Sequence, residues 1–396
     1  MTESKRSSVY LDYAASTPLD PSVAACMRSF EDTHFANAFS SHRDGREVKR
    51  ILEEARFGIA KHLGVQAHEC HFTNGATDAS SRAIRGVVEA MIEKGCAYSD
   101  LHIVMSAIEH SSVRSCVEAL GRRGVSVSLV PVSKDGIVDV LALQNILRPN
   151  TILVAVMLVN NELGTIQPIK EIAKVIREYA LTHTERLGIL NGREPILFVD
   201  ASQAPISIAV SPQELSADML ILDAQKIYGP KRTGLLYVRS NTPWTSLCGM
   251  FGRIPREGTP DVAGVLGMCR AYDVVIERRD ADMRRFQELK AYFVSQLKER
   301  FKNVIINGSL AESVPHILNV TFPGIDGEFL AAQLDVKGVA VAVKSACLSQ
   351  GGEGSYVIHA IAPERANEST RFSFGRATTT DDIDYVVSVL ADIVRK

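Results

Sequence analysis

The sequence predicts an α/β protein with a large domain built on a mainly parallel sheet and a smaller α+β domain. The chain has 396 residues, which is too long for one simple core. From about Glu53 to Tyr237, helical patterns alternate with short β-branched, apolar runs. Polar residues directly follow several of these runs. Alternation at this spacing is typical of a parallel sheet covered by helices on both faces.

The elements of the large domain follow from apolar periodicity. Helices are predicted at 55–63, 78–93, 111–123, 138–147 and 169–180. Strands are predicted at 71–73, 102–105, 126–130, 152–159, 196–199, 219–222 and 235–238. The polar segment Leu181–Glu194 contains Asn191-Gly192 and is predicted to be an inserted surface loop.

A long amphipathic stretch at 264–302 predicts a helix that leads into the second, smaller domain. Strands are predicted there near 304–306, 317–322, 339–343 and 370–373, followed by a terminal helix at 381–395. We expect residues 15–258 to form the large domain. Residues 1–14 and 259–396 are expected to form the small one.

Composition and charge favour a cytoplasmic enzyme over several other classes. A net charge of −2 gives no electrostatic case for binding nucleic acid. The longest apolar runs, such as Ile152–Val159, fall short of the ~20 residues of a membrane span. The short polar start, Met1–Val9, lacks the apolar core of a signal peptide. The seven cysteines are scattered without a C-x-x-C pair, so neither a zinc or other metal site nor a disulfide framework is indicated.

Two of the polar residues that follow strands suggest pyridoxal-5′-phosphate (PLP) chemistry. Lys226 precedes the turn Gly229-Pro230, and a lysine at a strand's end can point into a cleft, where desolvation makes its amine nucleophilic. Asp200 ends an apolar run, and a carboxylate beside the pyridine nitrogen of PLP keeps that ring an electron sink. A surface lysine and a helix N-cap are the ordinary alternatives.

Further groups complete what PLP needs from a protein. The strand–turn–helix pattern Phe72–Asp78 would form an anion site from free N–H groups and the Thr77 hydroxyl. His110 offers a flat ring for stacking and proton transfer. Gln203 and Asn161 offer amides for the ring oxygen or the substrate. A satisfied structural histidine and an ordinary glycine turn are the alternatives here.

The chain resembles the cysteine desulfurases of the class V aminotransferase family, because it carries these motifs in the same order. Cysteine desulfurases are fold-type I PLP enzymes. The resemblance runs from about Tyr10 to Ile393. The matching stretches are Leu11–Pro18, Thr73–Thr77, Glu109-His110, Val159–Gly164, Val199–Gln203, Lys226–Pro230, Gly258-Thr259, Ser345–Cys347 and Arg371–Arg376.

The resemblance implies a role for each matching residue. Lys226, His110 and Cys347 would be catalytic. The substrate carboxylate would bind Arg371, assisted by Asn161 and by Asn37. The implied cofactor-binding residues are Ala76, Thr77, His110, Asn161, Asp200, Gln203, Lys226 and Thr259. Thr259 would reach the phosphate in the neighbouring subunit, which implies a homodimer.

Cys347 distinguishes the desulfurase branch. It precedes a polar, glycine-rich run, Leu348–Gly354, which predicts a mobile loop of the length found in long-loop desulfurases. The resemblance implies that L-cysteine is converted to L-alanine and that Cys347 carries the sulfur as a persulfide. An iron–sulfur scaffold, a tRNA thiolation protein and DNA phosphorothioation machinery are the sulfur acceptors that fit.

Some positions depart from the family's pattern. Asp223 stands where a small hydroxyl residue usually binds phosphate, and its carboxylate would repel that phosphate unless it points away or pairs with Lys231 or Arg232. Gln225 replaces a histidine, and residues 248–253 replace a glycine- and histidine-rich stretch. Two alternatives therefore remain: another class V enzyme, such as an aminotransferase or selenocysteine lyase, and a non-catalytic homologue that acts as an interaction partner.

Overall fold

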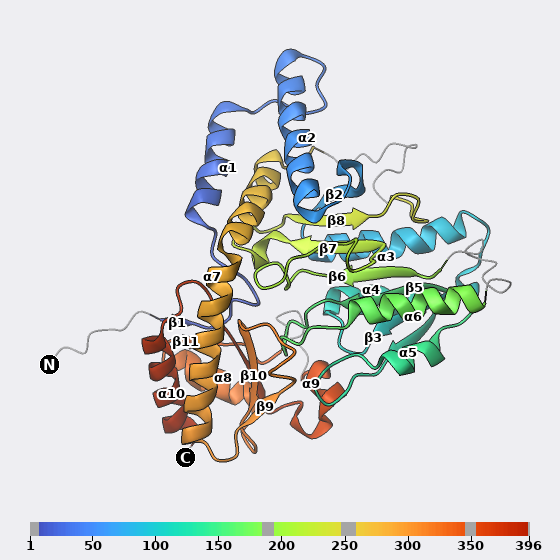
Figure 1. Cartoon of the computed structure of the whole chain (residues 1–396). Coiled ribbons are helices and arrows are strands. Elements are labelled where there is room, and N and C mark those ends of the chain that lie inside the picture. The colour runs from blue at the N-terminus through green and yellow to red at the C-terminus, as the bar shows by residue number, and fades with distance from the viewer. Residues whose placement is uncertain (1–7, 184–193, 247–258, 345–353, 395–396) are drawn as a thin grey trace.

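A seven-stranded sheet forms the centre of the larger part of the molecule (Figure 1). The computed structural model describes residues 8–183, 194–246, 259–344 and 354–394. The strand order is β2-β8-β7-β6-β5-β3-β4. The strands are β2 (Cys70–Thr73), β3 (His102–Ser106), β4 (Ser126–Val130), β5 (Thr151–Met157), β6 (Ile196–Asp200), β7 (Met219–Asp223) and β8 (Gly234–Val238). Every pair from β7 to β4 is parallel, whereas β8 is antiparallel to both neighbours, so the predicted mainly parallel sheet is confirmed.

Helices cover both faces of this sheet because its strands are apolar on both sides. In β7, Leu220 and Leu222 belong to one buried cluster, and Met219 and Ile221 belong to another. The second cluster contains side chains from α3 and α4, and the first contains side chains from α5, α6 and α7. These helices are α3 (Ala76–Ile92), α4 (Ser111–Gly121), α5 (Val140–Ile146), α6 (Ile169–Thr182) and α7 (Val262–Arg300).

The C-terminal part contains a three-stranded antiparallel sheet of order β12-β10-β9. Its strands are β9 (Ile305–Asn307), β10 (Ile317–Thr321) and β12 (Ser369–Ser373). A parallel pair of short strands, β1 (Val9–Tyr10) and β11 (Val339–Ala340), lies beside it. The helices of this part are α8 (Gly327–Val336), α9 (Tyr356–Ile361) and α10 (Thr380–Val394).

Helix α7 connects the two parts of the molecule. It extends from the N-terminal helices α1 (Pro21–Thr33) and α2 (Arg43–Leu63) down to α10 beside the smaller sheet (Figure 1). Within the described ranges, no helix combines the length and the apolar character needed to cross a bilayer.

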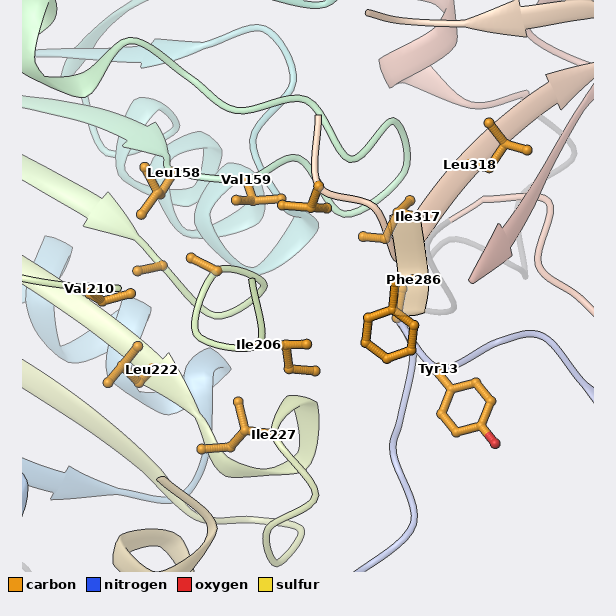
Figure 2. Close-up of a cluster of buried hydrophobic side chains, with 14 of the residues drawn as sticks. Tyr13, Leu158, Val159, Ile206, Val210, Leu222, Ile227, Phe286, Ile317 and Leu318 are labelled. Atoms are coloured by element: carbon orange, nitrogen blue, oxygen red, sulfur yellow. The ribbon is translucent and has the colours of Figure 1, made fainter. Parts of the chain in front are cut away.

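Buried side chains at the junction join the two sheets into one core. In Figure 2, Ile227 of the turn after β7 lies between Leu222 of the large sheet and Phe286 of α7, and Ile317 and Leu318 of β10 follow on the far side. All five belong to one buried cluster. The site described below lies beside this junction, so packing holds its two sides in place.

Several elements differ from the sequence prediction. Helix α2 begins at Arg43, twelve residues before the predicted start at 55. Its first half is helical because Val48 and Leu52 are buried on one face, while Arg50 forms exposed ion pairs with Glu47 and Glu54 on the other. Helices α1, α8 and α9 were not predicted. Asp20 caps α1 and Pro21 begins it, and this is a local signal that the sequence does contain.

The predicted strand at 339–343 ends at Ala340, and Ala342 makes only an isolated bridge to Arg371. Most of the predicted inserted loop, residues 184–193, lies outside the described residues. The division into residues 15–258 against 1–14 with 259–396 stays a proposal. It is supported by the β1–β11 pairing and by the bridge between Asp12 and Ser373.

Replacing Phe293 by alanine should destabilise the protein strongly. Phe293 of α7 is fully buried and its ring makes edge contacts with Phe372, at 5.1 Å between centroids, and with Phe374, at 6.1 Å. Truncation leaves a cavity between α7 and β12, which costs about 3–5 kcal/mol. Denaturant unfolding measures this loss. The control is Phe329→Ala, at a side chain that is 53% exposed; an equal loss in both variants would contradict the packing described.

Candidate active site

A pocket of about 190 Å³ lies at one edge of the large sheet. Eight of the residues predicted from the sequence line it, and they come from segments far apart in the chain. These are Ala76, Thr77, His110, Asn161, Asp200, Gln203, Lys226 and Arg371. The remaining lining residues are Ala14, Ala15, Met157, Val159, Ser202, Asp223 and Gln225.

Strand direction explains why most of these residues meet. Asp200 is the last residue of β6, and Lys226 ends the short turn of helix, Ala224–Lys226, that follows β7. His110 follows β3, and Asn161 follows β5. These four strands are parallel neighbours, so their carboxyl ends share one edge of the sheet.

The amine of Lys226 is held by backbone carbonyls from the N-terminal segment. Its Nζ donates to the oxygen of Ala14 at 3.0 Å and to that of Ala15 at 2.7 Å. Burial lowers the pKa of Lys226, and the carboxylates of Asp223 and Asp200 only partly oppose this effect. A neutral amine, which can act as a nucleophile or base, is therefore more accessible here than on a surface lysine.

His110 is the N-cap residue of α4. Its Nδ1 accepts a hydrogen bond from the Ser112 backbone N–H at 3.2 Å and lies 2.9 Å from the Ser112 hydroxyl. The neutral ring consequently carries its proton on Nε2. Burial lowers the pKa of His110, against the opposing field of Asp200. At neutral pH this favours an uncharged imidazole in the pocket.

Asp200 and Gln203 line the same pocket as Lys226 and His110, and both are buried. Asp200 Oδ1 accepts from the backbone N–H of Ser202 at 2.9 Å. The amide of Gln203 donates to the Ala14 oxygen at 2.8 Å, so it shares this carbonyl with Lys226. The side-chain oxygen of Ser202 is buried without a partner among the described residues.

Arg371 of β12 supplies the pocket's cationic group from the smaller sheet. One guanidinium nitrogen donates to the Asn161 backbone oxygen at 2.8 Å, and the other forms an ion pair with Asp12 at 2.6 Å. Its Nε and the side-chain oxygen of Asn161 are buried without partners among the described residues. Orphaned polar atoms of this kind normally find a ligand or water.

The remaining pocket wall is the first turn of α3, with Ala76 and Thr77. Gly75 occupies its N-cap position at φ 93°, a conformation that favours glycine, and offers no side-chain cap. Asp223 does not point away from this turn. Its carboxylate accepts hydrogen bonds from the backbone and side-chain amides of Gln225, and it lines the same pocket as Ala76 and Thr77.

Two described residues with implied roles do not line the pocket. Asn37 and Thr259 are both exposed, and the Asn37 amide donates to the Thr259 hydroxyl at 3.4 Å. Cys347 lies outside the described residues, as do residues 248–253.

Sequence reasoning assigned no role to two acidic residues at this site. Asp12 forms an ion pair with Arg371, which lies 359 positions away in the sequence, and no local sequence pattern predicts this pair. Glu109 is buried behind the pocket, where its Oε1 accepts from the Ser106 hydroxyl at 2.5 Å and from the Met157 N–H at 2.8 Å. The only sequence signal for Glu109 is its position beside His110.

Comparison with known proteins identifies relatives over nearly the whole chain. A family model described as Aminotransferase class-V matches residues 9–386. The cysteine desulfurase IscS of Dictyoglomus turgidum is 38% identical over 393 residues, which cover 98% of this chain and 95% of that protein. A solved structure named NifS-like protein matches with a TM-score of 0.86 at 28% identity and covers 98% of this chain and 99% of that one. Another, titled SspA in complex with cysteine, matches with a TM-score of 0.72 at 26% identity and covers 92% and 98%.

Glu109 should make stability depend on pH. Burial raises the pKa of Glu109 to about 8, so at intermediate pH the folded chain keeps a proton that the unfolded chain releases. Stability should therefore fall as pH rises from about 5 to about 8, by up to about 1.4 kcal/mol per pH unit, and then level off. Glu109→Gln should flatten this fall.

Denaturant unfolding at a series of pH values measures the effect. The control is Glu118→Gln, which changes an exposed glutamate of α4 that pairs with Arg114. Since both variants keep His110, their difference isolates Glu109. Parallel pH profiles for the wild type and Glu109→Gln would rule out this protonation.

Proposed function

The chain belongs to the class-V aminotransferase family, and on that premise we propose that it is a cysteine desulfurase that takes sulfur from L-cysteine. This family of enzymes depends on PLP, and the Dictyoglomus turgidum relative described above is a cysteine desulfurase. One observation carries the proposal for this chain: Lys226, Asp200 and His110 line a single pocket at the carboxyl edge of the sheet.

The pocket fits PLP at its ring end. In this assignment, Lys226 would bond covalently to the PLP aldehyde and Asp200 would contact the pyridine nitrogen. Gln203 would donate a hydrogen bond to the ring oxygen, and His110 would stack on the ring. Orphaned atoms of Ser202, Asn161 and Arg371 leave hydrogen-bonding capacity for a bound group. When bound, PLP supplies an electron sink that weakens the bonds of the substrate's α- and β-carbons.

The phosphate end is assigned to the first turn of α3, with Ala76 and Thr77, and to Thr259 of the partner subunit, while Asn161 is assigned to the ring oxygen or the substrate. Thr259 and Asn37 contact each other and both lie outside this chain's own pocket. Their position supports a role for both in the site of the partner subunit. A homodimer with shared sites is therefore part of the proposal.

Arg371 binds the carboxylate of L-cysteine. A planar guanidinium suits a carboxylate, and the Asn161 contact fixes the orientation of that guanidinium. Asp12 already pairs with the same group, so it neutralises Arg371 until substrate arrives. Lys226, with its lowered pKa, and the neutral His110 then move the α-proton of the substrate.

Cys347 accepts the sulfur. Its thiolate attacks the substrate's sulfur, a new S–S bond forms and the C–S bond breaks. The carbon keeps the electron pair and takes a proton, so L-cysteine and the enzyme thiol yield L-alanine and an enzyme persulfide. The persulfide then passes to a sulfur-acceptor protein, for which an iron–sulfur scaffold and a tRNA thiolation protein are the classes we propose.

A cytoplasmic location completes the proposal. The five described cysteines, at positions 26, 70, 96, 116 and 269, are all free thiols. Free thiols are typical of a reducing compartment.

The function is tested by following cofactor and products together. We expect yellow purified protein that converts L-cysteine, with a thiol reductant, to equal amounts of alanine and sulfide. Lys226→Ala and Cys347→Ser should each reduce both products by at least ~100-fold, because each removes a reacting group. The controls are Lys61→Ala at the end of α2 and Cys26→Ser on α1.

Two results would contradict the desulfurase activity. A colourless protein that stays inert with added PLP would indicate a non-catalytic homologue. Turnover that survives Cys347→Ser at the wild-type rate would indicate another class V enzyme, such as an aminotransferase or a selenocysteine lyase.

Shared sites are tested by mixing two defective chains. In a heterodimer of one Lys226→Ala chain and one Thr259→Ala chain, one site keeps both native residues if Thr259 serves the partner's pocket. About half of the wild-type activity should then return, at a PLP concentration that leaves the Thr259→Ala homodimer largely empty. No recovery would mean that Thr259 serves its own chain.

A further inference from the structure

Asp223 places a negative charge at the end of the pocket assigned to phosphate. It is the last residue of β7 and is 4% exposed. Its Oδ1 accepts from the backbone N–H of Gln225 at 3.1 Å, and its Oδ2 accepts from the Gln225 side-chain amide at 3.2 Å. Asp223 lines the same pocket as Ala76, the first residue of α3, and the backbone N–H of Ala76 partly offsets the rise that burial causes in the pKa of Asp223.

Asp223 caps the short turn of helix Ala224–Lys226, and its carboxylate lies in the same pocket as the first turn of α3. The first N–H groups of a helix have no partner within it, and they attract anions. Gly75 holds the N-cap position and provides no side-chain oxygen. Asp223, at the end of β7, places a carboxylate in the same pocket as this anion-attracting turn.

We infer that Asp223 competes with the cofactor phosphate for the first turn of α3 and thereby reduces what the phosphate contributes to PLP binding. This inference rests on the proposed function. In this protein the ring end of the pocket would account for most of the cofactor affinity. The phosphate would bind well only after Asp223 is displaced or takes up a proton.

The surroundings of Asp223 support this competition. Burial raises the pKa of Asp223 and outweighs the opposing charge of Lys226, the charged neighbour that acts on it most. Gln225 and Ala76 act on it through hydrogen bonds, not through charge. Once protonated, the carboxyl can donate to a phosphate oxygen, whereas the carboxylate can only repel it.

The experiment compares PLP with pyridoxal, which lacks the phosphate. Dissociation constants of both compounds are measured by absorbance on the apoprotein, and their ratio isolates the phosphate's contribution from that of Lys226. In Asp223→Asn and Asp223→Ser we expect this ratio to favour PLP by about 10-fold more than in the wild type, as removal of a nearby like charge predicts.

The matched control is Asp218→Asn. Asp218 is another acidic residue close to β7; it accepts from the Leu197 N–H, pairs with Arg239 and does not line the pocket. Its variant should keep the wild-type ratio. Raising the pH should weaken PLP relative to pyridoxal more in the wild type than in Asp223→Asn, because only the wild type has this carboxyl to deprotonate.

The outcomes separate this inference from the proposed function. A ratio that stays at the wild-type value in both Asp223 variants overturns the competition alone, because the protein still binds PLP. Failure of every variant to bind either compound overturns the proposed function together with this inference.

Discussion

Parallel pairing of β3, β5, β6 and β7 puts the carboxyl end of each strand at one edge of the large sheet. Buried backbone groups must be paired, so a shift in the register of these strands would break hydrogen bonds. It would also move apolar side chains out of the buried clusters on both faces of the sheet. The register of β6 and β7 therefore fixes the positions of Asp200 and Lys226. Loops alone would not hold groups from four segments in one pocket.

Burial then sets the chemistry of the groups that meet there. The same desolvation lowers the pKa of Lys226 and His110 and raises the pKa of Glu109 and Asp223. Each shift favours the uncharged form of its group. Groups whose pKa values all move toward the uncharged form suit proton transfer better than a set of fully charged side chains would.

The N-terminal segment connects the two sides of the site. Ala14 and Ala15 hold the amine of Lys226, and Asp12 holds the guanidinium of Arg371. Thr17 adds a hydrogen bond from its hydroxyl to the Gln225 oxygen at 2.8 Å. A few residues thus contact both the turn after β7 and strand β12, so a shift of either sheet would be transmitted to the groups proposed to bind cofactor and substrate.

By itself the sequence determined the strand–helix alternation and the polar residues at strand ends, because apolar periodicity and turn residues are local properties. That was enough to predict the large sheet and most of the eight site residues that line one pocket, whereas Arg371 was named only through the family resemblance. Tertiary structure alone decided which distant groups touch. The Asp12–Arg371 pair spans 359 positions, and Asp223 of β7 meets the first turn of α3 only in the shared pocket. Neither is encoded by local spacing, since each exists only when the sheets pack and bury these charges.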